Sequence, residues 1–141
     1  MKKDIETWIC VADFHWKFVD KKTLSILHKI ARELNPDVLC SLGDNVDYDG
    51  IGKFTLKNYG DGVDECEEEL NSFKKGWNEL VKSCGSPQQI MCLGNHDGER
   101  VDKLLYKLES KKLNREYKDV KRALDFNLNF PNIKVVPYNS F

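Results

Sequence analysis

The sequence lacks long hydrophobic runs, an excess of charge of one sign, and paired cysteine motifs. Its longest apolar runs, such as Trp8–Ala12, have about five residues, whereas a membrane helix needs ~20. The charged residues 1–6 are not followed by the apolar segment of a secretion signal. With 22 basic and 23 acidic residues the net charge is −1, so any contact with nucleic acid must be local. We therefore expect a cytoplasmic protein without a membrane partner.

The cysteines do not form a disulfide or zinc-binding pattern. They are five in number and include no Cys-x-x-Cys pair, which argues against a disulfide framework and a zinc knuckle. Three of them, Cys10, Cys40 and Cys92, lie inside apolar runs. We expect all five to be small buried hydrophobic residues.

Three apolar runs, Trp8–Ala12, Val38–Leu42 and Ile90–Leu93, barely alternate with polar residues. This pattern is typical of interior parallel strands that are buried on both faces. Apolar stripes with helical spacing lie between and after the runs, and they predict helices at residues 24–34, 63–84 and 101–108. The order predicts an α/β fold, with a parallel β-α-β-α-β core in a single domain over residues 1–141.

Two segments are less clear. Residues 111–122 fit a helix, residues 124–130 fit a helix or a strand, and residues 133–136 look like the start of a strand. The connection Tyr48–Gly62 is longer than the ~2–6 residues usual in such units. It is either a functional loop, in which lysines grip phosphate and aromatic rings stack on a base, or a surface insertion that packs its own aromatics. The residues concerned are Tyr48, Lys53, Phe54, Lys57 and Tyr59.

Each apolar run ends in residues that bind metals. The three segments are Asp13-Phe14-His15, Gly43-Asp44-Asn45-Val46-Asp47 and Gly94-Asn95-His96-Asp97. Taken singly, each is explained as a turn or a helix cap. The carboxyl ends of parallel strands share one edge of a sheet, however, so the three segments are expected to converge there. Carboxylate, imidazole and amide oxygen suit Mn²⁺, Fe, Zn²⁺ or Mg²⁺ rather than copper.

These three segments, in this order after strands, resemble the first three signature blocks of the calcineurin-like metallophosphoesterases. The long loop after the second block is most similar to small phage-encoded members, which would act in the host cytoplasm. The resemblance implies the four-layer α/β sandwich of that family, with this chain forming its first half. It also implies hydrolysis of a phosphomonoester or phosphodiester, with a nucleic acid or nucleotide among the candidate substrates.

The resemblance implies a role for each residue. Asp13 and His15 would hold the first ion of a dinuclear site, Asp44 would bridge both ions, and Asn95 would hold the second. Mn²⁺ is the first candidate metal, followed by Fe, Zn²⁺ and Mg²⁺. His96 would stand by the leaving-group oxygen as proton donor or charge stabiliser, oriented by Asp97. Asp47 would lie behind the ligands and fix the loop.

The chain also departs from the family pattern. It has three histidines and no Gly-His-x-His block, and His28 is expected at the edge of the core. The second ion would then keep only Asp44 and Asn95, which is too few for tight binding. We therefore expect a domain incomplete at its C-terminus, weakly active or inactive alone, and completed by a downstream fragment. The alternative is an inactive scaffold or subunit, which should have lost the ligand residues piecemeal.

Overall fold

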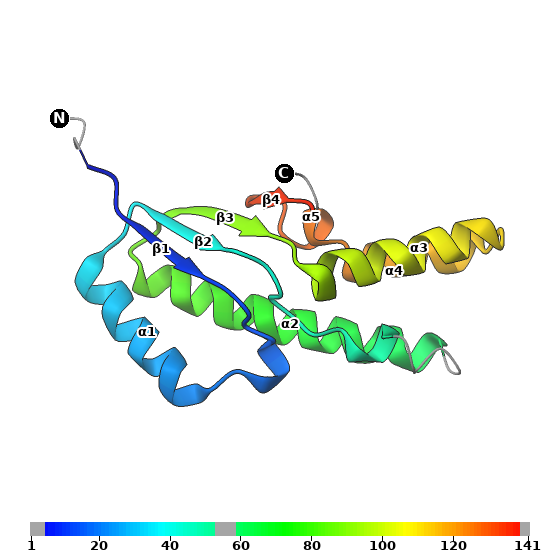
Figure 1. Cartoon of the computed structure of the whole chain (residues 1–141), viewed down its shortest axis with the longest axis horizontal. Helices are drawn as coiled ribbons and strands as arrows, with labels where there is room; N and C mark the ends of the chain where they lie inside the picture. Colours follow the sequence, from blue (N-terminus) through cyan, green and yellow to red (C-terminus); the bar gives the residue numbers. More distant parts are fainter. Residues whose placement is uncertain (1–4, 53–58, 139–141) are drawn as a thin grey trace.

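The computed structural model describes residues 5–52 and 59–138. Its centre is a sheet of four parallel strands whose spatial order is the order in the chain (Figure 1). The strands are β1 (Trp8–Val11), β2 (Val38–Ser41), β3 (Gln88–Cys92) and β4 (Lys134–Val136). This confirms the α/β fold with a parallel core.

In the described parts of the chain, five α-helices join the strands, and three short helical turns follow the first three strands. The helices are α1 (Lys21–Leu34), α2 (Tyr59–Ser83), α3 (Arg100–Ser110), α4 (Asn114–Leu124) and α5 (Phe126–Asn129); the turns are η1 (Trp16–Phe18), η2 (Asp49–Ile51) and η3 (Asn95–Glu99). Helices α1 and α2 lie on the same face of the sheet (Figure 1). Right-handed crossovers between strands that follow chain order require this. None of the described helices is long and apolar enough to cross a membrane.

Local signals set the bounds of α1. The Asp20 carboxylate accepts a hydrogen bond from Thr23 N at 2.7 Å, so it satisfies a free donor at the start of the helix. The helix ends at Leu34 and is capped by Asn35, whose backbone is left-handed (φ 44°) and whose N–H donates to Ala31 O at 3.0 Å. Pro36 follows and cannot continue the helix.

The core lies between the sheet and α2. Sheet residues such as Leu39 and Met91 meet Phe73 and Trp77 of α2 in one buried cluster. Trp77 Nε1 also donates to Gln89 Oε1 of β3 at 2.8 Å, which ties helix to sheet. The same helix therefore supports the middle of the sheet and, as shown below, the loops at its edge.

Leu124 ends α4 and Phe126–Asn129 form α5, so the strand alternative for residues 124–130 was wrong. Phe126 and Phe130 are four residues apart and stack with ring centroids 5.3 Å apart. Both also contact Phe73, at 6.3 and 6.0 Å. The helical spacing puts both rings on one side, and burial against α2 decides between two patterns that the sequence left equal.

The sheet face opposite α1 and α2 is more exposed than the sequence predicted. Only β2 is buried throughout; β1 alternates, with Ile9 in the core and Trp8 47% exposed. Cys10 is exposed rather than buried, whereas Cys40, Cys66 and Cys84 are buried as expected. The register pairs Cys10 with Cys40 and Cys40 with Ile90 on this face.

The reactivity of the cysteine thiols tests the exposure of Cys10 and the burial of Cys66 and Cys84. Burial raises the pKa of Cys40 to about 11 and that of Cys66 to about 12, so neither forms much thiolate at pH 8. We expect Cys10 to give the fast phase with dithionitrobenzoate in the native chain, and Cys66 and Cys84 to react only on unfolding. Cys10→Ser should remove the fast phase and Cys66→Ser should keep it. A fast phase that survives Cys10→Ser would contradict the exposure of β1.

Candidate metal centre

The segments after β1 and β2 run side by side beyond the ends of the strands. Asp13 N donates to Gly43 O at 3.1 Å, and His15 N donates to Asp44 O at 3.0 Å. The strand ladder thus continues into the loops. Asp13, His15 and Asp44 all have left-handed backbones, with φ of 52°, 38° and 50°. Such φ values are uncommon for residues other than glycine and cluster at functional sites.

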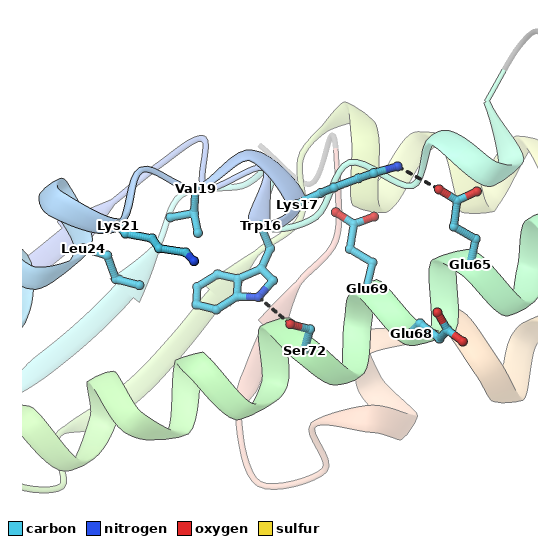
Figure 2. A pocket seen from close by; sticks show the side chains of 9 residues that line it. All are labelled: Trp16, Lys17, Val19, Lys21, Leu24, Glu65, Glu68, Glu69 and Ser72. Carbon is cyan, nitrogen blue, oxygen red and sulfur yellow. Dashed lines mark hydrogen bonds and ion pairs between the residues drawn. The ribbon is translucent and has the colours of Figure 1, made fainter.

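Trp16 anchors the first loop to α2. Its Nε1 donates to Ser72 Oγ at 2.9 Å, and its ring meets Phe73 edge-on at 5.6 Å. Gly76 makes room for the indole, because a Cβ there would lie 2.0 Å from a ring carbon of Trp16. Trp16 also forms a wall of a groove of about 740 Å³ (Figure 2), in which three glutamates of α2 outnumber two lysines: Glu65, Glu68 and Glu69 against Lys17 and Lys21.

Three of the expected metal ligands come together at this edge. Ligand atoms of Asp13, His15 and Asp44 lie within 4.8 Å of one another. Asp44 Oδ1 accepts from His96 N at 3.0 Å, so the third loop also rests on this carboxylate. Asn95, the fourth expected ligand, begins η3 directly before His96 and is exposed.

Two glycines allow the loops to approach so closely. Gly43 has φ 118°, a conformation that favours glycine. A Cβ on Gly94 would lie 2.1 Å from Asp44 Oδ1. Glycine is therefore favoured at position 43 by the backbone conformation and required at position 94 by the closeness of Asp44.

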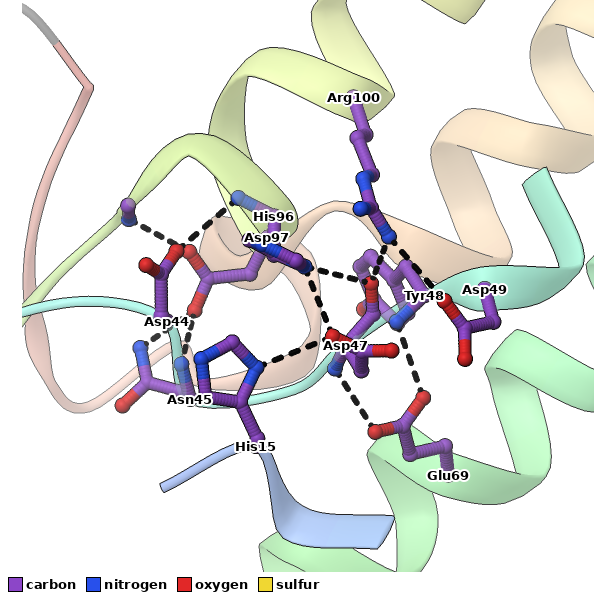
Figure 3. Close-up of polar contacts among 11 residues, drawn as sticks. His15, Asp44, Asn45, Asp47, Tyr48, Asp49, Glu69, His96, Asp97 and Arg100 are labelled. Atoms are coloured by element: carbon purple, nitrogen blue, oxygen red, sulfur yellow. Dashed lines mark hydrogen bonds and ion pairs between the residues drawn. The ribbon is translucent and has the colours of Figure 1, made fainter. Parts of the chain in front are cut away.

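Asp47 lies between two histidines (Figure 3). Its Oδ1 is 3.0 Å from His15 Nδ1 and 2.8 Å from His96 Nδ1. The two imidazole rings are perpendicular, with centroids 4.7 Å apart. An ionised carboxylate can only accept hydrogen bonds, so both Nδ1 atoms carry a proton. The Nε2 atoms are left for a ligand. Ligand atoms of His15, Asp47 and His96 also lie within 4.8 Å of one another, so these side chains form a second possible metal-binding group. His15 belongs to this group and to the group with Asp13 and Asp44.

Two further helices hold Asp47 in place. The Glu69 carboxylate of α2 accepts from Asp47 N at 2.8 Å and from Tyr48 N at 3.1 Å, while Arg100 Nη1 of α3 donates to Asp47 O at 2.5 Å. Burial raises the pKa of Asp47, but hydrogen bonds from Asp49 and His15 and the charges of His96 and Arg100 bring that pKa below its usual value overall. The hydrogen bond to Asp47 raises the pKa of Asp49. Asp47 is thus held as the anion.

Asp97 does not orient His96 as expected. Its carboxylate accepts from Gly94 N at 2.5 Å and from Asn45 N and Nδ2 at 2.6 and 2.7 Å. Burial raises the pKa of Asp97 in spite of these donors. Asp97 is therefore the tie between the second and third loops, and the contact to His96 Nδ1 is made by Asp47. From the sequence, either Asp47 or Asp97 could orient His96, and Asp97 was predicted because it is the next residue in the chain.

Comparison with known families fits this site. The model of the calcineurin-like phosphoesterase family matches residues 7–139. The chain belongs to the calcineurin-like phosphoesterase family. No curated protein and no solved structure gave a significant match.

The donors present fit the divalent ions of a metallophosphoesterase. Asp13, His15 and Asp44 offer two carboxylates and one imidazole within reach of one ion, a set typical of Mn²⁺, Fe, Zn²⁺ or Mg²⁺ sites. Asp47 behind His15 completes the carboxylate–histidine arrangement that orients metal-binding imidazoles. His28 lies apart on α1, half-buried, with Nδ1 2.8 Å from Ser83 Oγ.

The long loop is only partly described. Lys53, Phe54 and Lys57 lie outside the described residues, as does the side chain of Tyr59. Tyr48 is fully buried, its hydroxyl donates to Leu124 O at 3.4 Å, and burial raises its pKa well above the usual value. Tyr48 therefore joins the second loop to α4 and is not placed to stack on a base.

Substitution of Gly76 tests the contact with Trp16, because higher helix propensity and a clash with the indole change the free energy of unfolding in opposite directions. Glycine to alanine inside a helix normally adds up to about 1 kcal/mol of stability, and Asn78→Ala, at an exposed position of the same helix, should show a gain. We expect Gly76→Ala to lower the free energy of unfolding by about 1–2 kcal/mol, since the methyl group displaces the indole. Urea denaturation measures both variants.

Removing the indole separates the two effects. In a Trp16→Ala background, Gly76→Ala should recover the helical gain. A loss of stability that is the same with and without the indole would show that Trp16 does not sit on Gly76.

Proposed function

We propose that this chain is a metal-dependent phosphoester hydrolase with a dinuclear centre at the edge of the sheet. The observation that carries the proposal is the cluster of Asp13, His15 and Asp44 beside His96, whose Nδ1 is held by Asp47. Family membership supports the reaction class. The ligand cluster and the positioned histidine supply the parts that the reaction needs.

The ligands divide between two ions. Asp13 and His15, through its free Nε2, would hold the first ion, Asp44 would bridge, and the Asn95 amide oxygen would hold the second. Bound divalent ions of this kind lower the pKa of water and neutralise phosphoryl oxygens. Mn²⁺ is the proposed metal among the ions that suit a set of carboxylate, imidazole and amide donors.

His96 acts on the leaving group. Its Nδ1 is 2.8 Å from Asp47 Oδ1, which leaves Nε2 as the nitrogen that faces a substrate. Protonated at Nε2, the ring donates its proton to the leaving-group oxygen, and the Asp47 anion stabilises the imidazolium beforehand. Asp47 is therefore a positioning residue that acts through both histidines.

The second ion limits the activity. His96 is the last histidine of the sequence, so this chain gives that ion only Asp44 and Asn95. Few protein ligands mean weak binding and a low occupied fraction. Slow turnover is the expected behaviour of these 141 residues alone.

Hydrolysis of bis-p-nitrophenyl phosphate tests the function. With Mn²⁺ in excess we expect slow turnover that chelator removes and that His96→Ala lowers. The loss should be smaller than the general-acid contribution of about 100-fold, because p-nitrophenolate leaves with little need of a proton. His28→Ala is the matched control and should keep the wild-type rate. Rapid turnover would contradict the weak second site. Complete inactivity together with failure to bind Mn²⁺ would contradict the proposed function and favour the alternative, an inactive scaffold or subunit.

Two aspartates separate direct from indirect roles in metal binding. Titration calorimetry should show that Asp44→Asn weakens Mn²⁺ binding more than Asp47→Asn, because Asp44 is a proposed ligand and Asp47 acts through His15. Loss of a supporting group costs about 10–100-fold in affinity, and we expect Asp44→Asn to exceed that range. The exposed Asp119→Asn should change nothing. Equal losses for Asp44 and Asp47 would instead favour the group His15, Asp47 and His96 as the metal ligands.

A further inference from the structure

A second cavity is distinct from the Trp16 groove and shares none of its described lining residues. It has a volume of about 380 Å³ and lies between η2 and the start of α3. Asn95 lines it, so the cavity adjoins the proposed position of the second metal ion. A group bound there would be a neighbour of the phosphate undergoing hydrolysis.

The cavity is lined by positive charge. Arg100, Lys103 and Lys107 line it from α3, and among the described residues that line it Glu99 is the one carboxylate. Their spacing of three and four residues puts them on one face of the helix. Three cations against one anion leave an excess of positive charge, whereas in the Trp16 groove three glutamates face two lysines. A polyanion would be attracted to the α3 side of the site and repelled from the α2 side.

Arg100 links this cavity to the catalytic loop. Its Nη1 contacts Asp47 O at 2.5 Å and Asp49 Oδ1 at 3.5 Å. A guanidinium group has five N–H donors in a planar fork that matches phosphate oxygens, so Arg100 retains donors for a ligand beside these Nη1 contacts. Lys103 is 72% exposed, and its partner Glu99, the last residue of η3, lies 2.7 Å away. An exposed pair of this kind is weak and is readily exchanged for a phosphate.

We propose that this cavity binds a phosphate group of the substrate other than the one that is hydrolysed. The inference rests on the proposed function and narrows its substrate class to molecules with two or more phosphates. Arg100, Lys103 and Lys107 would hold the additional phosphate while the metal ligands hold the reacting one. A nucleic-acid strand and a nucleoside polyphosphate share this chemistry.

Binding of short oligonucleotides tests the inference without relying on turnover. Fluorescence anisotropy compares fluorescein-labelled dithymidylate, with one internucleotide phosphate, and tetrathymidylate, with three, in the presence of Mn²⁺. The measured quantity is the ratio of their dissociation constants. We expect Lys103→Ala/Lys107→Ala to reduce the preference for tetrathymidylate about tenfold, as expected for loss of two exposed charge contacts. Arg100 is left intact because it also positions Asp47.

The control keeps the same change of charge. Lys118→Ala/Lys121→Ala removes two exposed lysines from α4, outside the cavity, and should retain the wild-type ratio. The salt dependence gives a second readout, since each phosphate contact on a single strand contributes about 0.7 to the slope of log affinity against log salt. For tetrathymidylate, the slope should fall by about 1.4 in the Lys103/Lys107 variant only.

The outcomes separate the two claims. A wild-type ratio in the Lys103/Lys107 variant, or an equal loss in the Lys118/Lys121 control, overturns the cavity as a phosphate site. Absence of Mn²⁺-dependent hydrolysis of bis-p-nitrophenyl phosphate, with the ratio still dependent on Lys103 and Lys107, overturns the proposed function and supports the cavity. Competition by adenosine triphosphate that depends on the same lysines supports a nucleoside polyphosphate, and a preference for tetrathymidylate alone supports a strand.

Discussion

The site depends on one buried carboxylate that accepts hydrogen bonds from two imidazoles. Asp47 Oδ1 lies within 3.0 Å of Nδ1 of both His15 and His96, so a single group sets the ring orientation of a proposed metal ligand and of the proposed acid. A buried anion needs compensation. Hydrogen bonds from the imidazoles of His15 and His96 to this carboxylate provide that compensation. Displacing Asp47 would therefore alter metal binding and proton donation together.

Helix α2 is the frame against which this arrangement is built. It supplies Glu69, which accepts from the backbone of the Asp47 loop, and Gly76, on which the indole next to His15 rests. It also supplies Phe73 and Trp77 to the core. A long helix with a continuous buried stripe fixes distances that loops alone would leave variable. The position of the site therefore follows from core packing as much as from the site residues.

Much of this was predictable from sequence, for identifiable reasons. Asp13, His15 and Asp44 follow strands whose ends must share an edge, so their convergence follows from topology. The partner of His96 was not predictable, because the direction of Asp47 depends on the left-handed backbone at Asp44 and on Glu69, which is distant in the sequence. Likewise, the burial of Tyr48 and the exposure of Cys10 depend on which elements cover each face, and neither local spacing nor residue type contains that information.

The strained backbone of the loops explains why the protein needs such a frame. Asp13, His15, Asp44 and Tyr48 all have positive φ, and each such residue costs of order 1–3 kcal/mol unless the surrounding structure enforces it. Here backbone bonds between the first two loops, the three donors on Asp97 and the Glu69 clamp enforce it. Packing and hydrogen bonds therefore offset, during folding, the unfavourable free energy of bringing the carboxylates together. An ion that binds at this edge meets ligands already in place, so its binding energy is not spent on ordering the loops.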